Sequence, residues 1–238
     1  MAYIKASISG ICTQTPSVKT FILDCGSQRF DYYPGQWVDL RLNIDEKIHQ
    51  GGYSITSVPD KNNSIELAIK YASDFPLTTH LHDHSNIGDE LYLSNGQGNV
   101  ALSAPITTPL VLIAGGVGIS PLMSMLRYAE AIKTTTPVVL LYSITRPDEF
   151  LFGESLQKIQ HTLADFQYFI TATRANHPAF EFSGRINQAM LASINLPADA
   201  SYYLCGPPTM VEDVAEMLTN LQTRLSIDPN NIHYDKWW

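Results

Sequence analysis

Apolar and polar positions alternate in short runs over the first hundred residues of the chain. The runs span residues 4–8, 18–23, 37–42, 53–58, 65–71 and 90–93. Segments rich in Pro, Gly, Asn and Asp, such as 33–36 and 59–63, separate them, as turns separate strands. The pattern predicts an antiparallel six-stranded β-barrel. One short helix is expected at 78–84, with Thr78 as the cap of its first turn.

From residue 109 onward, apolar strands alternate with helices. Strands are predicted at 110–114, 138–142, 168–172 and 202–205, and helices at 121–132, 152–161, 187–193 and 209–225. Continuously apolar strands separated by helices indicate a doubly wound parallel sheet that is covered on both faces. We therefore expect two domains, a barrel over residues 1–102 and an α/β domain over 106–238. A length of 238 residues suits two such domains.

The composition indicates a folded chain with an acidic balance. Hydrophobic residues make up 45% of the sequence and the net charge is −8. This charge disfavours nonspecific binding to nucleic acid or to an anionic membrane, because both need a basic surface. No window approaches the roughly 20 apolar residues of a membrane span, and the N-terminus lacks the pattern of a signal peptide. A cytoplasmic monomer is expected.

The cysteines and histidines do not predict a metal centre. Within His80-x-His82-x-His84, only the first and last residues share a helix face, and no ligand cluster accompanies them. The three cysteines are too far apart to resemble an iron–sulfur or zinc ligand set, and their odd number fits a reducing compartment. They are Cys12, Cys25 and Cys205.

A glycine-rich turn joins the strand at 110–114 to the following helix. Glycines let the backbone approach a pyrophosphate, and the helix N-terminus offers N–H groups to an anion. Ser120 is expected to cap the helix and Pro121 to occupy its first position. A tight connection without a ligand is the alternative. The residues expected to bind here are Gly115, Gly116, Gly118, Ser120 and Pro121.

A second turn follows the strand at 202–205. It contains Cys205, Gly206, Pro207 and Met210. Ligands of doubly wound sheets bind beyond the carboxyl ends of the strands, so both turns are expected to converge on one crevice. For Cys205 alone, a buried apolar role is the alternative.

Five segments together resemble the ferredoxin-NADP reductase superfamily and, within it, the oxidoreductase NAD-binding domain-containing proteins. They follow the family order over almost the whole chain. The resemblance implies FAD on the barrel and NADPH or NADH on the α/β domain. The segments are Tyr53-Ser54-Ile55, Gly115-Gly116-Val117-Gly118-Ile119-Ser120-Pro121, Leu141-Tyr142-Ser143, Cys205-Gly206-Pro207-Pro208-x-Met210 and Lys236-Trp237-Trp238.

The resemblance also implies roles for single residues at the flavin. Tyr53 would stack on the flavin ring, and Ser54, followed by Ile55, would hydrogen bond to its N5 edge. Thr78 falls where a Ser or Thr helps to bind the flavin pyrophosphate at a helix start. Tyrosine on a strand and threonine at a helix start are also ordinary structural choices.

The end of the chain resembles reductases in which an aromatic residue covers the flavin. Trp237 and Trp238 take this place, with filling of a groove between the domains as the alternative. Asp235 is the nearby carboxylate. The implied catalytic set is Ser54 to orient N5, Cys205 to pack against the nicotinamide, and Asp235 to hydrogen bond during transfer.

One position departs from the family pattern. Gly51 stands two residues before Tyr53, where the family usually has an arginine that contacts phosphate. Either Lys70 or Arg41 compensates, or the flavin binds more weakly than is usual.

Two arginines bear on the choice of nucleotide. Arg146 follows the second strand of the α/β half and Arg174 follows the third. Arginine near these strand ends accommodates a 2′-phosphate, so both favour NADPH, with NADH kept open. Pairing of Arg146 with Asp148 and Glu149 is the alternative.

The function implied by the resemblance is hydride transfer between NADPH or NADH and FAD, with electrons passed to an acceptor outside the chain. Ferredoxin or flavodoxin is the implied acceptor. These proteins are typically acidic, however, and 23 acidic against 15 basic residues would repel them. Free flavin, a quinone, a ferric complex or an enzyme subunit stay open. A nucleotide-binding regulatory or assembly module that has lost its flavin, or an electron-transfer subunit of a larger complex, are the alternative functions.

Overall fold

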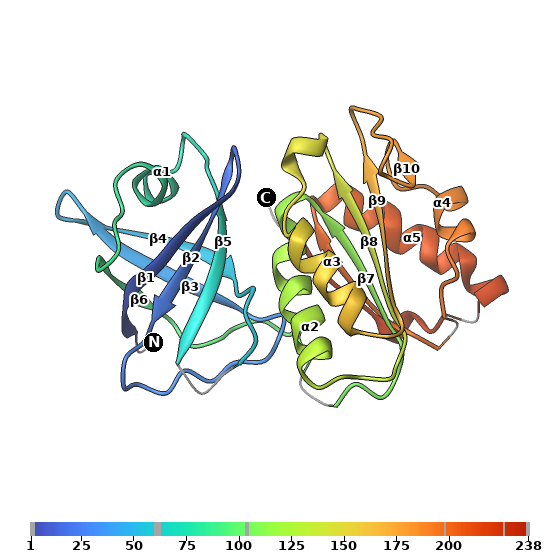
Figure 1. Cartoon of the computed structure of the whole chain (residues 1–238), viewed down its shortest axis with the longest axis horizontal. Coiled ribbons are helices and arrows are strands. Elements are labelled where there is room, and N and C mark those ends of the chain that lie inside the picture. The colour runs from blue at the N-terminus through green and yellow to red at the C-terminus, as the bar shows by residue number, and fades with distance from the viewer. Residues whose placement is uncertain (1–2, 60–62, 103–104, 198, 226, 237–238) are drawn as a thin grey trace.

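The computed structural model describes residues 3–59, 63–102, 105–197, 199–225 and 227–236. Two sheets with their own helices lie side by side (Figure 1). The strands of the first end by residue 93, and those of the second begin at residue 110. The predicted two-domain fold class is confirmed, whereas the boundaries at residues 102 and 106 stay a prediction.

The N-terminal sheet has six antiparallel strands in the order β4-β3-β6-β1-β2-β5. An antiparallel bridge between Ile55 and Leu67 joins the ends of the sheet and closes it into a barrel. Both side chains are fully buried in the barrel core. The elements are β1 (Ile4–Thr15), β2 (Val18–Asp24), β3 (Trp37–Ile44), β4 (Lys47–Ser54), β5 (Ser64–Lys70), α1 (Pro76–Asp83) and β6 (Glu90–Leu93).

The C-terminal sheet has six parallel strands in the order β10-β9-β8-β7-β11-β12. Its strands are β7 (Leu110–Gly115), β8 (Val138–Ile144), β9 (Phe166–Ala172), β10 (Phe182–Ser183), β11 (Ser201–Gly206) and β12 (Ile232–Lys236). Its α-helices are α2 (Ile119–Ala131), α3 (Gly153–Thr162), α4 (Gln188–Ser193) and α5 (Pro208–Leu225). Within the described ranges, no helix is long and apolar enough to cross a membrane.

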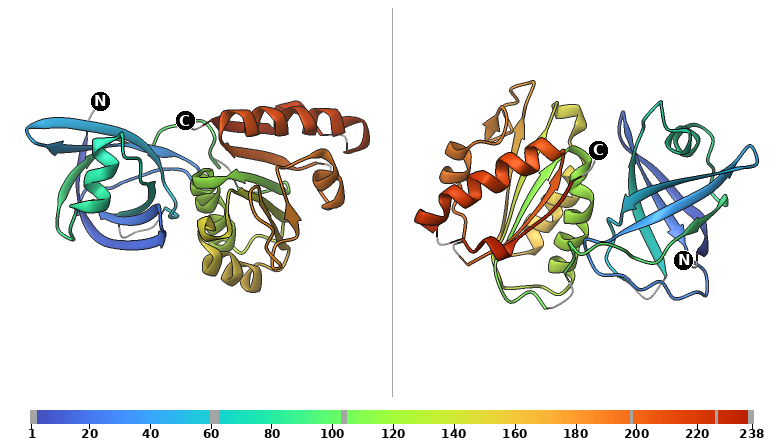
Figure 2. Two further views of the ribbon diagram at one scale, coloured as in Figure 1. Left: turned by 90° about the horizontal axis from the view of Figure 1, so that it is seen from above. Right: turned by 180° about the vertical axis from the view of Figure 1, so that it is seen from behind.

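Helices cover both faces of the parallel sheet, as Figure 2 shows. Alternate side chains of β7 explain this arrangement. Leu110, Leu112 and Ala114 pack with α2 and α3 on one face, whereas Val111 and Ile113 pack with α4 and α5 on the other. The continuously apolar strand therefore contributes side chains to two hydrophobic cores, one on each face of the sheet.

Strand β4 corrects one prediction from the sequence, which placed this strand at 53–58. β3 and β4 are joined by a two-residue turn at Asp45 and Glu46, with φ of +50° and +64°. The turn lacks the Asn or Gly that usually marks such hairpins. The strand itself is polar and partly exposed over most of its length, so it has no apolar alternation to detect.

The two outer strands of the parallel sheet, β10 and β12, were not predicted. β10 has only two residues. β12 has no fully buried residue and reads Ile-His-Tyr-Asp-Lys, because an edge strand need not be apolar on both faces. Both strands matter for the site described below.

The start of α2 corrects a second prediction. The helix begins at Ile119, directly after a 3₁₀ turn at Gly116–Gly118, so Ser120 and Pro121 lie inside its first turn. Ser120 therefore does not cap the helix, and Pro121 is not its first residue. The Ser120 hydroxyl instead donates a hydrogen bond to the carbonyl of Val117 at 2.8 Å.

Candidate functional site

The two glycine-containing turns meet at the carboxyl ends of β7 and β11. A Cβ atom on Gly118 would overlap the carbonyl oxygen of Cys205 and would lie 2.8 Å from the Cα of Gly206. Only glycine lets the two backbones pack this closely. Both turns line one cavity of about 490 Å³. The predicted convergence of the turns is confirmed.

Most of the residues predicted to bind NAD(P) line this cavity. They are Gly115, Gly116, Gly118, Gly206, Pro207 and Met210. Ser120 lines a neighbouring cavity instead, and Pro121 is buried within α2. The first N–H groups of a helical segment lack an intrahelical acceptor, so the turn at Gly116–Gly118 suits an anion.

Neither arginine predicted to favour NADPH lines the cavity. Arg146 is 57% exposed and pairs with Asp148 at 3.0 Å and with Glu149 at 3.7 Å. The hydrogen bond to Asp148 is the main cause that raises the pKa of Arg146. Arg174 is exposed beyond the end of β9. A third arginine, Arg185, lines the cavity.

Sequence reasoning missed Arg185 because it missed β10. Arg185 follows this two-residue strand after Gly184, which has a φ of +89°. The available signal was the dipeptide Ser183-Gly184, because Ser-Gly marks a turn.

A second cavity, of about 380 Å³, lies between the barrel and the start of α2. It is lined by residues from β4, β5, α1, the turn before α2 and the first turn of α2, among them Tyr53, Ser54, Lys70, Thr78, Val117 and Ser120. Ser54 is 7% exposed, and no hydrogen bond in the described part of the chain uses its hydroxyl. Ile55, predicted with this group, points into the barrel core and lines neither cavity.

Gly51 lies directly beside Tyr53 in this cavity. A Cβ atom on Gly51 would lie 2.8 Å from the Tyr53 hydroxyl, so the tyrosine ring covers the place where a side chain at residue 51 would begin. Burial raises the pKa of the Tyr53 hydroxyl to about 12. The hydroxyl is therefore a neutral hydrogen-bond donor at physiological pH.

The helix start at α1 corrects the prediction made for Thr78. Thr78 is the third residue of the helix rather than its cap. Its hydroxyl donates to the carbonyls of Ala72 and Phe75, at 2.9 Å and 3.0 Å. These bonds hold the segment that leads from β5 into α1 against the helix. The N–H groups of the first helical turn remain suited to an anion at the cavity.

Lys70 and Arg41 were the two cations expected to compensate for Gly51. The guanidinium of Arg41 lies 3.8 Å from the centre of the Tyr3 ring and donates to Gln50 at 2.6 Å, and it lines neither cavity. Lys70, at the end of β5, lines both cavities. No ion pair within the described residues engages its ammonium group.

The remaining predicted residues lie on the last two strands of the parallel sheet. Cys205 is fully buried, lines neither cavity and stands opposite Asp235 in the register of β11 and β12. Lys236, opposite Gly206, pairs with Glu212 of α5 at 2.7 Å and fixes the end of β12. Trp237 and Trp238 lie outside the described residues.

Asp235 should make stability depend on pH. Burial raises the pKa of its carboxyl group, against the effect of a hydrogen bond from the Lys236 N–H. The folded state therefore holds this proton more tightly than the unfolded state, whose pKa is about 3.9. Stability should fall as the pH rises from about 4 through the raised pKa. Thermal unfolding should show Asp235→Asn gaining stability over the wild type between pH 4 and pH 8.

The control is Asp165→Asn, which changes an exposed carboxyl group at the start of β9. A difference between Asp235→Asn and the wild type that stays constant over the same range would contradict the prediction, and so would a gain by Asp165→Asn equal to that of Asp235→Asn.

Comparisons with known proteins agree with this arrangement. Residues 7–101 match the oxidoreductase FAD-binding domain, and residues 112–216 match the oxidoreductase NAD-binding domain. Oxidoreductase NAD-binding domain-containing protein 1 of Xenopus tropicalis is 30% identical, over 98% of this chain and 79% of that protein. The protein of the same name from Danio rerio is 29% identical, over 100% of this chain and 93% of that protein.

Two solved structures share the fold. The flavohem-like FAD/NAD binding domain of nitric oxide dioxygenase from Vibrio cholerae has a TM-score of 0.88 and 20% identity, with 98% of each chain covered. A ferredoxin NADP+ reductase from Neisseria gonorrhoeae, with bound FAD and NADP, has a TM-score of 0.83 and 22% identity, with 100% of each chain covered.

The fold and the two matched domains define an oxidoreductase with separate FAD-binding and NAD-binding domains. The chain belongs to the oxidoreductase NAD-binding domain-containing proteins, and it shares the fold of the ferredoxin NADP+ reductase from Neisseria gonorrhoeae. The barrel cavity fits a flavin in three respects. It offers the unengaged Ser54 hydroxyl, the cation of Lys70 and the N-terminal turn of α1.

Proposed function

We propose that the protein is a FAD-dependent NAD(P)H reductase that transfers hydride between NADPH or NADH and bound FAD and passes electrons to an acceptor. The adjacency of the two cavities carries this proposal. One lies on the barrel and the other at the carboxyl ends of the parallel strands, and Lys70 and Val117 line both. A flavin in the first and a nicotinamide in the second would meet at this shared wall.

In this mechanism the flavin, when bound, supplies the redox chemistry by accepting the hydride. Ser54 would donate a hydrogen bond to the N5 edge, and Tyr53 would pack against the ring and donate from its neutral hydroxyl. Cys205 lies buried directly before Gly206 and would support the turn that lines the nucleotide cavity. Asp235, which stands opposite Cys205 on β12, would accept a hydrogen bond during transfer.

NADPH is the donor that we favour, through Arg185. Its guanidinium lies on the nucleotide cavity together with Ser143 and Thr145 at the end of β8. Arginine and hydroxyl groups near the end of the second strand of such a sheet suit a 2′-phosphate. We assign this contact to Arg185 in preference to Arg146 and Arg174.

The acceptor is proposed to be a ferredoxin, a flavodoxin or a protein of similar role. The Neisseria gonorrhoeae neighbour is named for ferredoxin. An acidic acceptor would need a local basic surface on a chain with a net charge of −8, so its reduction should depend on ionic strength. We also propose that the protein is cytoplasmic and monomeric.

The test of the proposed function is the absorbance spectrum of the purified protein with and without added FAD. Flavin bands that bleach on anaerobic addition of NADPH or NADH are the expected result, and the rates rank the two donors. A protein that takes up neither FAD nor FMN would contradict the proposal.

A second function, a nucleotide-binding regulatory or assembly module, draws support from Gly51. Without a cation at residue 51, the described residues that line the barrel cavity include one cation, Lys70, which the nucleotide cavity shares. A colourless protein that still binds NADP⁺ in calorimetry would favour this module.

Lys70→Met should weaken the binding of both FAD and NADP⁺ by about tenfold each. An ammonium–phosphate hydrogen bond contributes about 1.5 to 3 kcal/mol, and exposure of Lys70 places the effect at the lower end. Calorimetric titration of each ligand measures the two effects. Lys47→Met, in the exposed hairpin at the far end of β4, is the matched control and should leave both affinities unchanged. A loss confined to one ligand would show that Lys70 serves one cavity alone.

A further inference from the structure

One face of α2 carries polar residues, although most of the helix is apolar and buried. Ser120, Ser124 and Arg127 are spaced four and three residues apart, so they lie on the same side of the helix. This side faces the barrel, and α2 is the helix nearest to it (Figure 1). The spacing of polar residues in an apolar helix marks a specific contact between the two domains.

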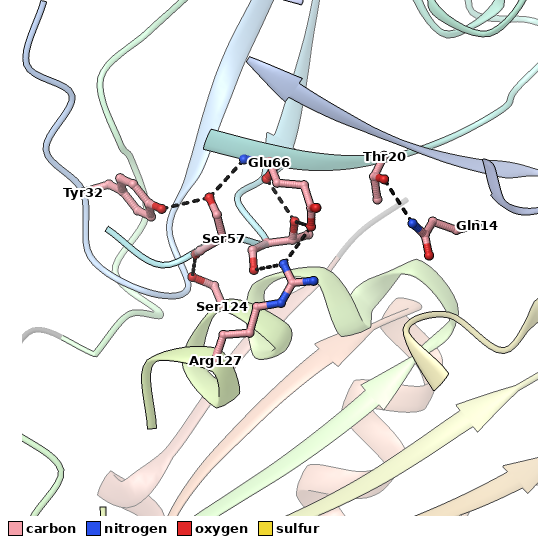
Figure 3. Close-up of polar contacts among 8 residues, drawn as sticks. Gln14, Thr20, Tyr32, Ser57, Glu66, Ser124 and Arg127 are labelled. Atoms are coloured by element: carbon pink, nitrogen blue, oxygen red, sulfur yellow. Dashed lines mark hydrogen bonds and ion pairs between the residues drawn. The ribbon is translucent and has the colours of Figure 1, made fainter. Parts of the chain in front are cut away.

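Arg127 and Ser124 reach from α2 to the barrel, as Figure 3 shows. The Arg127 Nη1 donates to Glu66 Oε1 at 2.7 Å and to the carbonyl of Thr56 at 2.9 Å. The Ser124 hydroxyl donates to the carbonyl of Ser57. The Arg127 and Glu66 side chains are only 22% and 21% exposed, so solvent screens this pair less than an ordinary surface pair.

Hydrogen bonds within the barrel hold the barrel residues of this contact in place. The Thr56 hydroxyl donates to Glu66 Oε1 at 2.6 Å, and the Thr56 N–H donates to the Glu66 carbonyl at 2.8 Å. The Ser57 hydroxyl accepts from the Glu66 N–H at 3.0 Å and lies 2.9 Å from the Tyr32 hydroxyl. The contact therefore joins a prearranged part of the barrel to a helix.

The contact lies at the far end of the elements that hold the two cavities. Glu66, Ala68 and Lys70 occupy alternate positions of β5, on the face outside the barrel core. Ala68 packs into the core cluster that contains α2, and Lys70 lines both cavities. Along α2, Ser120 lines the barrel cavity, and Arg127 follows seven residues later, about 10 Å along the helix.

We propose that Arg127 is a positioning residue for hydride transfer. Held by Glu66 and Thr56, it sets the orientation of α2 against β5, and so the separation of the barrel cavity from the nucleotide cavity. The inference rests on the proposed function. Arg127 lines neither cavity, so loss of its side chain should alter the rate of hydride transfer rather than the affinity for either cofactor.

The test compares Arg127→Met, Arg127→Lys and Glu66→Gln with the wild type in anaerobic stopped-flow reduction of the FAD-loaded protein. Arg127→Met should lower the limiting rate of flavin reduction by about 10- to 100-fold, since misplacement by 1 Å costs up to about a hundredfold. The nucleotide dissociation constant and the FAD affinity should stay unchanged. Arg127→Lys should recover part of the rate. Arg127→Met/Glu66→Gln should be no slower than Arg127→Met, because the two residues act as one unit.

Glu90→Gln is the matched control, because it breaks an ion pair of the same 2.7 Å length that lies wholly within the barrel, between Lys5 and Glu90. It should leave the limiting rate unchanged. A lower melting temperature for Arg127→Met with an unchanged limiting rate would assign Arg127 a structural role only and would overturn the proposal. An equal slowing by Glu90→Gln would overturn it as well.

A measurement without flavin separates this inference from the proposed function. Small-angle X-ray scattering of the cofactor-free protein should show a wider spread of distances between the domains for Arg127→Met than for the wild type. If the wild type takes up no flavin, the proposed function fails, while this difference still tests the contact. Identical scattering curves would overturn the positioning role.

Discussion

Gly118→Ala should slow the reduction of bound FAD by about 10- to 100-fold when NADPH or NADH is below saturation. The added methyl group would overlap the carbonyl oxygen of Cys205 and would lie 2.6 Å from its carbonyl carbon. Both atoms are backbone, so no side-chain rotation relieves the overlap, and the two turns must separate. Such overpacking costs about 1 to 3 kcal/mol in stability. Nucleotide binding should weaken by about 10- to 100-fold, because the same turns form its cavity.

Calorimetric titration with NADP⁺ and thermal unfolding measure the two effects of Gly118→Ala. The barrel cavity does not include Gly118, so FAD should still bind. Gly10→Ala is the control, because its methyl group would meet only the side chain of Ile22, at 3.1 Å, within the barrel. Normal nucleotide binding by Gly118→Ala would show that the turns adjust without loss and that their close packing does not shape the cavity.

Ser54→Ala should slow flavin reduction by about 30-fold while the protein keeps its FAD. Ser54 is 7% exposed and lines the barrel cavity, and its hydroxyl has no hydrogen-bond partner in the described part of the chain. A hydrogen bond to a site of developing charge contributes about 2 kcal/mol to lowering the barrier, which corresponds to this factor. Single-turnover reduction with saturating nucleotide measures the rate.

The control for Ser54→Ala is Ser9→Ala, which removes an exposed hydroxyl that donates to the Ile22 carbonyl. Its reduction rate should match the wild type. If Ser54→Ala reduces FAD at the wild-type rate, Ser54 does not orient the N5 edge, and Tyr53 becomes the candidate donor on that cavity.

The sequence predicted those strands whose apolar pattern matches their burial in the folded protein. The continuously apolar β7 and β8 are buried on both faces, so their type and position follow from composition alone. β4 and β12 escaped prediction for the opposite reason. Partly exposed strands are specified by their neighbours: β4 carries no alternating apolar pattern, and β12 is only five residues long with no buried residue.

The residues of the candidate site also fall into those that the sequence predicted and those that it did not. Glycines such as Gly118 were recognised because the close approach of two backbones demands them, and this demand is visible in the sequence. Arg146 was assigned to the nucleotide, whereas the structure has the alternative pairing with Asp148 and Glu149. Arg185 was missed because β10, the strand that precedes it, has only two residues. The contact of Arg127 with Glu66 joins residues that are 61 positions apart, and no local pattern relates them.

The position of Lys70 on both cavities has a thermodynamic consequence. One ammonium group cannot give its full charge to phosphates on two ligands at once, so each ligand should alter the affinity of the other. Linkage requires the two factors to be equal: whatever NADP⁺ does to the dissociation constant of FAD, FAD must do to that of NADP⁺. Because this chain has no cation at residue 51, its affinity for FAD should depend on the concentration of free nucleotide.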